Sequence, residues 1–493
     1  MKYVNSPNSV SIQDVIRNHF IFAPSQYSSF ASEEKRFDTL NNLVELKNER
    51  VKIKKDPLYT YIEIGDIDVN TGLVGGREVH GVFVPSITPL SISHGDLLIS
   101  TVRTYRKGIG IITSSKKNLV GSPALLVISG VKDNISKEYL LAFLRSDFFV
   151  EQILAFQKRG MYPRLDRDNI NDVSIALPRD SEELKYVSYL QRSLIEREGR
   201  IRDRSSLIIK VIGDELLRGQ QEHTFVYEMP CFNNIKNDNR LDAGYYSYEY
   251  RQKKFLLENY LYGSDPIKKW DYEIERGQNL QESTIGNSIY SSFPKKGFYT
   301  LIRPTNISEY GTVSKFEYLG NSNQLSILQQ GDIVFSAEGT IGKCILFANP
   351  KENSITNIHG IILRKKDHNI KESAFVACIL RFQRDWKVFD YLSVGGQGGS
   401  MAMQYWDDIL IPNFPKEKRE KIAKYYFNEE QFNVESNCDL ETFVLKDEKY
   451  VEVAGIVQLD ESAKLIERRL AEVLHQIIKG EKVSADFSFF NKE

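Results

Sequence analysis

The chain contains one pattern of residues twice, and this repeat limits its possible folds more than any other feature. The segment Gly95–Ser100 (Gly-Asp-Leu-Leu-Ile-Ser) returns 236 residues later as Gly331–Ser336 (Gly-Asp-Ile-Val-Phe-Ser). The flanking segments recur in the same order: Arg36–Asp38 with Arg240–Asp242, Tyr61–Ile67 with Leu301–Ile307, and Ile175–Pro178 with Leu410–Pro412. Solenoid repeats have periods of roughly 20–50 residues. A much longer spacing predicts two homologous domains, each followed by a helical segment.

The bulk composition excludes several classes of protein. With 493 residues, the chain is long enough for two or three domains, each with its own core. Its four cysteines (Cys231, Cys344, Cys378 and Cys438) form no Cys-x-x-Cys pair, which argues against a zinc cluster or a disulfide framework. No apolar run reaches the roughly 20 residues that span a bilayer, and the first residues lack the apolar core of a signal peptide. We therefore expect a cytoplasmic protein with no membrane partner.

Charge is distributed unevenly, although the net charge is only −1. No acidic residue occurs between Leu97 and Lys132, a stretch that holds six basic side chains including Lys132 itself. A shorter basic cluster, Arg364–Lys366, lies at the corresponding position of the second copy. Local basic patches of this kind attract phosphate groups. For any single patch, a solvated basic face is the simpler alternative.

Each copy combines strand-forming and helix-forming segments. In the first copy we predict a helix over 37–55, strands over 58–130, and a helix over 136–157 with Ser136 as its N-cap. In the second copy we predict strands over 298–365 and a helix over 372–392. A loop at 158–164 follows the helix over 136–157, and a loop at 395–400 follows the helix over 372–392. The order of elements therefore repeats along with the residues.

The connector between the copies, residues 181–219, reads as one long helix. Its apolar residues Val187, Leu194, Ile201 and Ile208 recur at intervals of seven, which indicates packing against another helix. The expected partner is the C-terminal segment, with apolar residues at helical spacing: Ile466, Leu470, Val473 and Ile477. At 1.5 Å per residue the connector would be about 55 Å long. Residues 415–460 look more broken than a plain helical region.

Motifs of enzyme chemistry are missing from the sequence. No glycine-rich loop ends in Gly-Lys-Ser/Thr, and there is no His-Glu-x-x-His and no nucleophile elbow. Asp56–Tyr59 (Asp-Pro-Leu-Tyr) lacks the central proline of the short motif found in amino-methyltransferases. The sequence therefore predicts a non-catalytic chain.

The ordered, duplicated set of motifs resembles the specificity (S) subunits of type I restriction-modification systems. The segments at 61–67, 95–100 and 175–178 are similar to landmarks of the target-recognition domains in that family, and degenerate copies fall at 301–307, 331–336 and 409–412. Arg240–Tyr246 resembles a typical entry to a second recognition domain. No single motif is specific, but the ordered set spans nearly the whole chain.

The resemblance implies an α+β fold with two homologous mixed α/β target-recognition domains. Long antiparallel coiled-coil-like helices would separate them in a pseudo-two-fold symmetric arrangement. We expect a first recognition domain over 1–180, a central helical spacer over 181–222, a second recognition domain over 223–414 and a C-terminal helical region over 415–493. Half-sites on one face of DNA lie about 34–36 Å apart, so a helix of about 55 Å is long enough to set their separation.

The resemblance also implies a function. The chain would be the DNA sequence-recognition subunit, not an enzyme, of a type I restriction-modification complex that defends against phage. Each recognition domain would read one half of a bipartite, asymmetric site on double-stranded DNA, and the helices would set the spacer and dock two methyltransferase (M) subunits. Restriction/translocase (R) subunits would complete the assembly. S-adenosylmethionine, ATP and Mg²⁺ would be bound by the partner subunits, and this chain itself would hold no cofactor and no metal.

Two alternatives remain open at this point. The domains could be the recognition part of a fused methyltransferase or nuclease, against which the missing catalytic motifs argue. They could also form a duplicated protein-binding scaffold that has no role on DNA. Methylation by the purified chain would favour the first alternative, and an assembly without sequence preference on DNA would favour the second.

The candidate DNA-binding residues come from the basic patches and the late loops. Basic side chains fix the register of a protein on phosphates, and polar side chains read base edges. Surface solubility would equally explain any one of them. In the first copy the candidates are Arg103, Arg106, Lys107, Lys116, Lys117, Lys158, Arg159, Tyr162 and Arg164; in the second they are Lys343, Arg364, Lys365, Gln397, Ser400 and Gln404.

Overall fold

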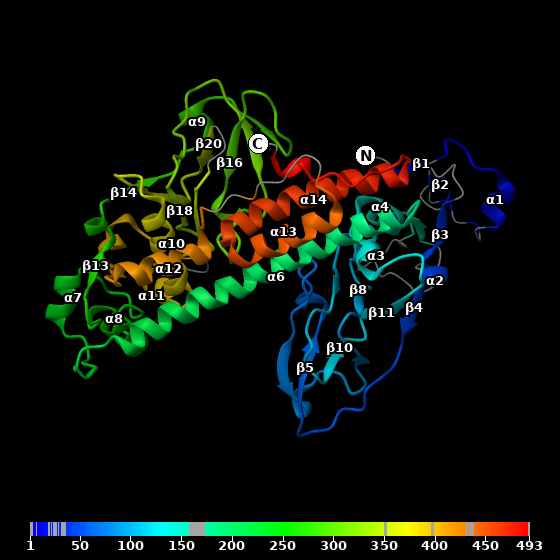
Figure 1. The fold of residues 1–493 in the computed structure, drawn as a ribbon. Helices are drawn as coiled ribbons and strands as arrows, with labels where there is room; N and C mark the ends of the chain where they lie inside the picture. Colours follow the sequence, from blue (N-terminus) through cyan, green and yellow to red (C-terminus); the bar gives the residue numbers. More distant parts are fainter. Residues whose placement is uncertain are drawn as a thin grey trace. The chain divides into compact units, whose positions relative to one another are not determined.

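The fold is described by a computed structural model, drawn in Figure 1. The described residues are 3–156, 173–349, 353–395, 399–429, 432 and 438–491, with gaps at 6, 18–19, 21, 23–26, 28 and 31–35. The chain divides into two compact units. Unit 1 comprises residues 1–199, 432–448 and 461–493, and unit 2 comprises residues 200–431 and 449–460.

The main core of unit 1 forms on an antiparallel sheet with the strand order β4-β11-β8-β9. These strands are β4 (Val44–Lys47), β8 (Leu97–Ser100), β9 (Ile109–Ile111) and β11 (Leu125–Val131). Every residue of β8 is buried. Two helices, α3 (Lys137–Leu144) and α4 (Asp147–Phe156), contribute side chains to the same hydrophobic cluster as this sheet.

A second four-stranded sheet in unit 1 has the order β6-β5-β10-β7 and its own smaller apolar clusters. Its strands are β5 (Leu58–Ile62), β6 (Arg77–His80), β7 (Leu90–Ser91) and β10 (Leu119–Gly121). The remaining pairs and helices are β1 (Val4–Asn5) with β2 (Ser29–Phe30), β3 (Phe37–Thr39) with β12 (Ser174–Ala176), α1 (Ile12–Arg17) and α2 (Leu40–Leu43). Short 3-10 turns lie at Ile64–Asp66 (η2), Gly81–Phe83 (η3) and Thr104–Arg106 (η4).

Unit 2 has the corresponding pair of sheets, ordered β14-β21-β18-β19 and β15-β17-β16-β20. The strands of these sheets are β14 (Tyr272–Arg276), β15 (Ile289–Ser291), β16 (Tyr299–Ile302), β17 (Glu317–Gly320), β18 (Ile333–Ser336), β19 (Cys344–Leu346), β20 (Ser354–Thr356) and β21 (Gly360–Lys365). A separate antiparallel pair is formed by β13 (Ser264–Pro266) and β22 (Leu410–Pro412). The helices are α7 (Phe232–Asp238), α8 (Tyr248–Glu258), α9 (Glu282–Ile285), α10 (Ile370–Asp385), α11 (Val388–Leu392) and α12 (Lys416–Tyr426). Three 3-10 turns lie at Ile267–Trp270 (η5), Pro304–Asn306 (η6) and Met403–Asp408 (η7).

The sequence repeat corresponds to a repeat of topology in the first sheet and in three strands of the second, whose fourth strand pairs with β10 in unit 1 (β7) and with β17 in unit 2 (β15). Each unit pairs a strand of its second sheet in parallel with a later one, β5 with β10 in unit 1 and β16 with β20 in unit 2. A 3-10 turn and an isolated antiparallel bridge follow the first strand of that pair in both units, Ile67 with Val74 and Ile307 with Val313. The expected α+β fold with two homologous mixed α/β domains is confirmed at the level of each unit.

The repeated Gly-Asp pair builds a tight turn before a buried strand. Gly95 and Gly331 have φ of +77° and +87°, a region that glycine enters without steric cost. The Asp96 carboxylate accepts the backbone N–H of Ser93 at 2.8 Å, and Asp332 accepts that of Gln329 at 2.8 Å. Both aspartates are buried, and each is paired with a cation. The most recognisable motif of the sequence is thus structural.

Three helix predictions need correction. Residues 37–55 are not one helix, because only Leu40–Leu43 are helical and the flanking segments are the strands β3 and β4. The helix predicted over 136–157 is interrupted between α3 and α4. The helix predicted over 372–392 is likewise divided into α10 and α11. Ser136 is the N-cap of α3, as expected, because its side chain accepts the N–H of Tyr139 at 2.9 Å.

Three long helices contribute residues to both units: α6 (Ser181–Arg218), α13 (Leu440–Val453) and α14 (Ile456–Ile478). The predicted connector helix matches α6. In unit 1, Val187 and Leu194 belong to the same apolar cluster as the predicted partners on α14, Ile466, Leu470, Val473 and Ile477. In unit 2, Ile201 and Ile208 lie instead in a cluster with residues at the α13–α14 junction: Val451, Ala454, Ile456, Val457 and Leu459. No helix in the described part of the chain is long and apolar enough to cross a membrane.

A buried ion pair joins α6 to α13 inside unit 1. The side chains of Arg197 and Asp447 are 0% and 4% exposed, and Arg197 Nη1 donates to Asp447 Oδ2 at 2.9 Å. The same carboxylate accepts the hydroxyls of Tyr189 at 2.5 Å and Ser193 at 2.8 Å, while Arg197 Nε donates to Ser462 of α14 at 2.9 Å. Such a fully bonded network fixes the register of the helices that contribute to it.

Candidate nucleic-acid interface

Three of the predicted DNA-binding residues, Arg103, Arg106 and Lys107, lie on the loop between β8 and β9. Arg103 and Lys107 flank the 3-10 turn η4 and both have left-handed backbone conformations, with φ of +52° and +59°. Internal hydrogen bonds stabilise the turn, since Thr104 Oγ1 donates to the Ser100 carbonyl at 2.6 Å and Ser100 Oγ donates to the Val102 carbonyl at 2.8 Å. The loop therefore presents its basic side chains from a well-defined backbone.

The conformation of Arg103 is costly for a residue with a side chain. An L-residue in the left-handed region loses roughly 1–2 kcal/mol relative to its preferred conformations. The matching position of unit 2, three residues after the repeated serine, is Gly339 with φ of +71°. Unit 1 thus keeps an arginine where the homologous turn uses glycine. Backbone strain of this kind is concentrated at functional sites, which favours a functional role for the Arg103 side chain.

We expect substitutions to glycine at two positions of this loop to have opposite effects on stability. Arg103→Gly removes the left-handed strain, so the free energy of unfolding should stay unchanged or rise by up to about 1 kcal/mol. Arg106→Gly, in a turn without positive φ, should lower it by about 0.5–1 kcal/mol. Each variant loses one cation, half-buried at Arg103 and exposed at Arg106, and should weaken DNA binding. Urea denaturation and gel-shift titration measure the two effects, and a destabilised Arg103→Gly would contradict the strain argument.

Arg145, at the C-terminal end of α3, anchors this loop. Its guanidinium donates to the carbonyls of Ile109 at 2.8 Å and Lys107 at 3.3 Å, and to those of Asn70 at 2.6 Å and Val69 at 3.2 Å. Burial lowers its pKa somewhat, with no carboxylate in direct contact among the described residues. One side chain thus connects the β8–β9 loop to the loop over 68–72. The sequence contains no signal that distinguishes this arginine from a surface residue.

Apart from the two arginines of the β8–β9 loop, the basic candidates of unit 1 fall into three groups: Lys107 and Lys116 have acidic neighbours, Lys117 is exposed, and the late-loop residues lie outside the described residues. Lys107 Nζ is 2.8 Å from Asp147, and Lys116 Nζ is 2.6 Å from Glu78, both at exposed sites. Exposed pairs of this kind contribute little to stability and exchange partners easily. Lys117 is exposed beside Lys116. The late-loop candidates Lys158, Arg159, Tyr162 and Arg164 lie outside the described residues.

The basic residues of unit 2 that were predicted to contact DNA are buried or paired with carboxylates. Lys365 is only 4% exposed, and its ammonium bonds to the Trp270 carbonyl at 2.9 Å and to Glu372 at 2.8 Å. Arg364 pairs with the buried Asp332 at 2.7 Å, and Lys343 pairs with Glu309 at 2.8 Å. Because Lys365 lies in the core, we remove it from the candidate phosphate contacts. Arg364 and Lys343 would have to leave their carboxylates to bind a phosphate.

The remaining candidates of unit 2 lie near the end of the domain. Ser400 forms backbone bridges with Glu338 and Val394, and Gln404 is exposed on the turn η7. Gln397 lies outside the described residues. The bridge to Glu338 brings Ser400 next to the β18–β19 loop, the counterpart of the basic loop of unit 1.

A polar group at that β18–β19 loop was missed by the sequence analysis. Glu338 Oε2 is 2.5 Å from His359 Nδ1, and Glu338 Oε1 is 3.6 Å from Arg276 Nη1. All three side chains are more than one third exposed. The matching turn of unit 1 carries Arg103, so an alignment of the two copies could have pointed to residues 337–342. Homologous loops of the two units therefore carry unlike charges.

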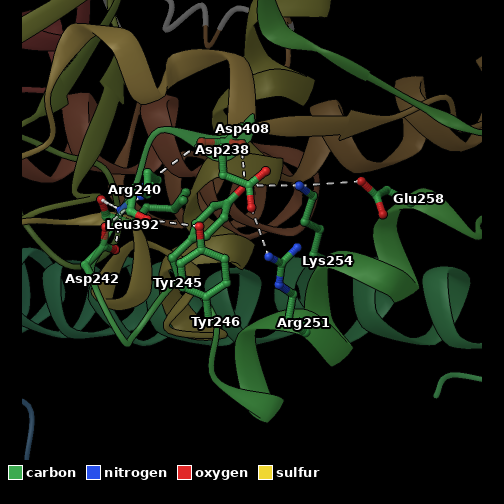
Figure 2. Close-up of polar contacts among 10 residues, drawn as sticks. All are labelled: Asp238, Arg240, Asp242, Tyr245, Tyr246, Arg251, Lys254, Glu258, Leu392 and Asp408. Atoms are coloured by element: carbon green, nitrogen blue, oxygen red, sulfur yellow. Dashed lines mark hydrogen bonds and ion pairs between the residues drawn. The ribbon is translucent and has the colours of Figure 1, made fainter. Parts of the chain in front are cut away.

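Figure 2 shows the polar cluster formed by the segment Arg240–Tyr246. The Arg240 side chain is 1% exposed and donates two hydrogen bonds to Asp242, at 2.6 and 2.9 Å, and one to the Leu392 carbonyl at 3.1 Å. Tyr246 donates its hydroxyl to the Arg240 carbonyl at 3.0 Å. Burial alone would raise the pKa of Asp242, but the hydrogen bonds and charge of Arg240 keep it below its ordinary value. Arg240, Tyr245 and Tyr246 are thus buried residues that hold the segment in place, while Leu241 between them is exposed.

The described residues contain no group of three or more histidine, cysteine or acidic side chains that could hold a metal ion. Two cysteines of unit 2, Cys344 and Cys378, are buried, and burial raises the pKa of each thiol to about 12. Both therefore remain neutral near pH 7 and lack the thiolate that a nucleophile or a metal ligand needs.

Neither a protein-family model nor a curated protein matches the chain. Three solved structures are similar to it over most of their length. One, described as the structural basis of complex assembly and conformational transition of the type I R-M system, shares 15% identity over 91% of this chain and 98% of the other, with a TM-score of 0.33. The HsdS subunit from Thermoanaerobacter tengcongensis shares 16% identity over 91% and 97%, with a TM-score of 0.32. The type I restriction-modification S subunit from M. genitalium shares 11% identity over 90% and 97%, with a TM-score of 0.41. At identities and TM-scores this low, the function has to be argued from the residues of the chain itself.

Proposed function

We propose that the chain is the specificity subunit of a type I restriction-modification complex, in which each homologous domain reads one half of a bipartite, asymmetric DNA site. The observation that carries this proposal is the pair of matched loops. They follow the same repeated strand in sheets of the same strand order, yet one carries Arg103, Arg106 and Lys107. The other carries Glu338 beside Arg276 and His359, and its one cation, Lys343, is paired with Glu309.

The two loops suit different parts of DNA recognition. Arginine and lysine side chains on a rigid loop bind phosphates and, in bidentate form, the O6 and N7 atoms of guanine. Glutamate accepts a hydrogen bond from the N4 amino group of cytosine, and an adjacent arginine can bind guanine. Because the loops differ while the supporting sheets agree, the two half-sites should differ in sequence.

The helices α6, α13 and α14 would set the spacer between the half-sites and provide surfaces for two methyltransferase subunits. Helix α6 has 38 residues, a length of about 57 Å at 1.5 Å per residue. The chain itself would be non-catalytic. S-adenosylmethionine, ATP and Mg²⁺ would be held by the methyltransferase and restriction/translocase subunits.

The experiment that tests this function is methylome sequencing of the host with and without the gene for this chain. We expect deletion to remove adenine methylation from one split, asymmetric motif while other methylated motifs stay unchanged. Restoring the gene should restore that motif. Complementation with a gene carrying Lys365→Met, which alters only a core lysine, should keep the same motif if the subunit still folds.

An unchanged methylome together with co-purification of an active methyltransferase would contradict the proposal. Methylation by the purified chain alone would instead favour a fused enzyme.

A further inference from the structure

Unit 2 contains a cavity of about 420 Å³. Residues of four segments line it: α6, the loop after η6, the β18–β19 loop and α10. The charged lining residues are Lys210, Glu309, Lys343, Arg381, Arg384 and Asp385. Four of these six are basic, so the cavity wall has a formal charge of +2. Its volume lies within the range of small-molecule sites, roughly 300–1,000 Å³.

Arg381 is the unusual member of this set. It is 5% exposed, and its Nη2 donates to Ser205 Oγ, also on the cavity wall, at 2.6 Å. Its Nε and Nη1 atoms are buried and have no hydrogen-bond partner within the described residues. The guanidinium lies 5.3 Å from the ring of Tyr426, which offsets only part of the cost of burying the charge. A buried guanidinium normally has a carboxylate or another anion as its partner.

The groups that surround Arg381 cannot supply that negative charge. The thiols of Cys344 and Cys378 and the phenol of Tyr426 are its neighbours, and burial raises the pKa of all three groups well above neutrality. All three are therefore neutral at pH 7. Arg381 forms no ion pair within 4 Å in the part of the chain described.

The carboxylates on the cavity wall do not fill this role either. Glu309 is shared by Lys343, at 2.8 Å, and by Arg384, and although burial alone would raise its pKa, these two partners hold it below its ordinary value. Among the described lining residues, Asp385 is the only other acidic one, and Lys210 also lines the cavity. An excess of positive charge thus remains beside Arg381.

We propose that this cavity binds an anion of the phosphate class, either a free phosphate group or a phosphate of the nucleic-acid backbone. Three observations support it: the cavity, its excess of cations, and a buried arginine for which the described residues provide no anionic partner. Phosphate oxygens accept hydrogen bonds from the fork of an arginine and from lysine. This inference does not rest on the proposed DNA-recognition function, because it concerns the purified chain and inorganic phosphate.

The test is isothermal titration of the full chain with inorganic phosphate in chloride buffer at constant ionic strength. We expect saturable binding at one site per chain. Arg381→Met removes the charge and keeps most of the side-chain volume, and it should weaken binding at least about tenfold, as the loss of a charge-assisted hydrogen bond does. Lys210→Met, at an exposed helix position that is safe for folding, should weaken binding severalfold. The matched control is Lys268→Met, an exposed lysine of unit 2 outside the cavity lining, which should bind as the wild type does.

Two further measurements then distinguish a free phosphate group from a phosphate of the nucleic-acid backbone. If the occupant is a backbone phosphate, inorganic phosphate should compete with duplex DNA for the assembled complex, and Arg381→Met should reduce the slope of log affinity against log salt by about 0.9. If the occupant is a free anion, DNA binding should be insensitive to both changes. No saturable phosphate binding by the wild-type chain, or equal binding by the wild type, Arg381→Met and Lys210→Met (an adventitious ion only), would overturn the proposal.

Discussion

Replacing Arg103, Arg106 and Lys107 together by glutamate is expected to abolish specific binding of duplex DNA by the assembled complex. Each lost phosphate contact lowers the slope of log affinity against log salt by about 0.9, so three contacts account for a decrease of roughly 2.7. Reversal of charge adds repulsion of several kcal/mol between like charges. We therefore expect the affinity at physiological salt to fall at least about 100-fold. Gel-shift titration at several salt concentrations measures both quantities.

The matched control reverses three other exposed or half-exposed charges of unit 1, with the same change in net charge. Lys52, Lys54 and Lys55 are exposed on the segment before β5, and glutamate at these positions should leave the affinity within about threefold. Circular dichroism should give the native spectrum for both triple variants, because exposed substitutions cost little stability. An equal loss of affinity in the two triple variants would attribute the effect to net charge and remove the β8–β9 loop from the interface.

Asp447→Ala should lower the free energy of unfolding of unit 1 by about 3–5 kcal/mol, the usual cost of leaving one member of a buried ion pair alone. The substitution leaves the Arg197 guanidinium, with a fully buried side chain, without its carboxylate. It also removes the acceptor of the Tyr189 and Ser193 hydroxyls. Urea denaturation with amide hydrogen exchange on α6 and α13 peptides measures the loss.

Glu448→Ala is the control for that experiment, because Glu448 is the exposed neighbour of Asp447 on the same helix. It should change the free energy of unfolding by no more than about 0.5 kcal/mol. The double variant Arg197→Met, Asp447→Leu should recover most of the stability, since apolar residues of similar volume often replace a buried ion pair without loss. If Asp447→Ala proves as mild as Glu448→Ala, the network has no structural role.

Elements of the fold are predictable from the sequence where local signals and long-range packing agree. Helix α6 begins at Ser181 and ends just before Gly219, and its apolar residues repeat every seven positions. These signals all predict the same structure, one long helix that packs against another. The segment 37–55 has apolar residues at helical spacing as well, but only four of its residues are helical. The next four form β4, which pairs with β11 some 80 residues later. Local periodicity contains no information about a partner so distant in the chain.

The site residues were harder to predict, because a sequence shows charge but not direction. Arg364 and Lys365 are consecutive in β21, so their side chains point to opposite faces of the sheet. Only one member of such a run can face away from the core, and Lys365 is the buried one. A positive φ at Arg103, and the absence of an anionic partner for Arg381 among the residues that the structure describes, likewise exist only in three dimensions. The β8–β9 loop was proposed from charge alone, because residues 97–132 hold six basic side chains and no acidic one, and its contact with DNA stays a prediction.

The aspartate of the repeated turn has a consequence for chimeric proteins. In unit 1 the cation beside Asp96 is Lys47 of β4, and in unit 2 the cation beside Asp332 is Arg364 of β21. By strand register, Lys47 of β4 and Glu275 of β14 occupy equivalent positions in the two sheets. The cation that pairs with the aspartate therefore comes from a different strand in each copy. Grafting a single strand between the domains would therefore leave a buried aspartate with two cations or with none. The smallest part that can be exchanged between these homologous domains is the whole sheet, with its compensating charges included.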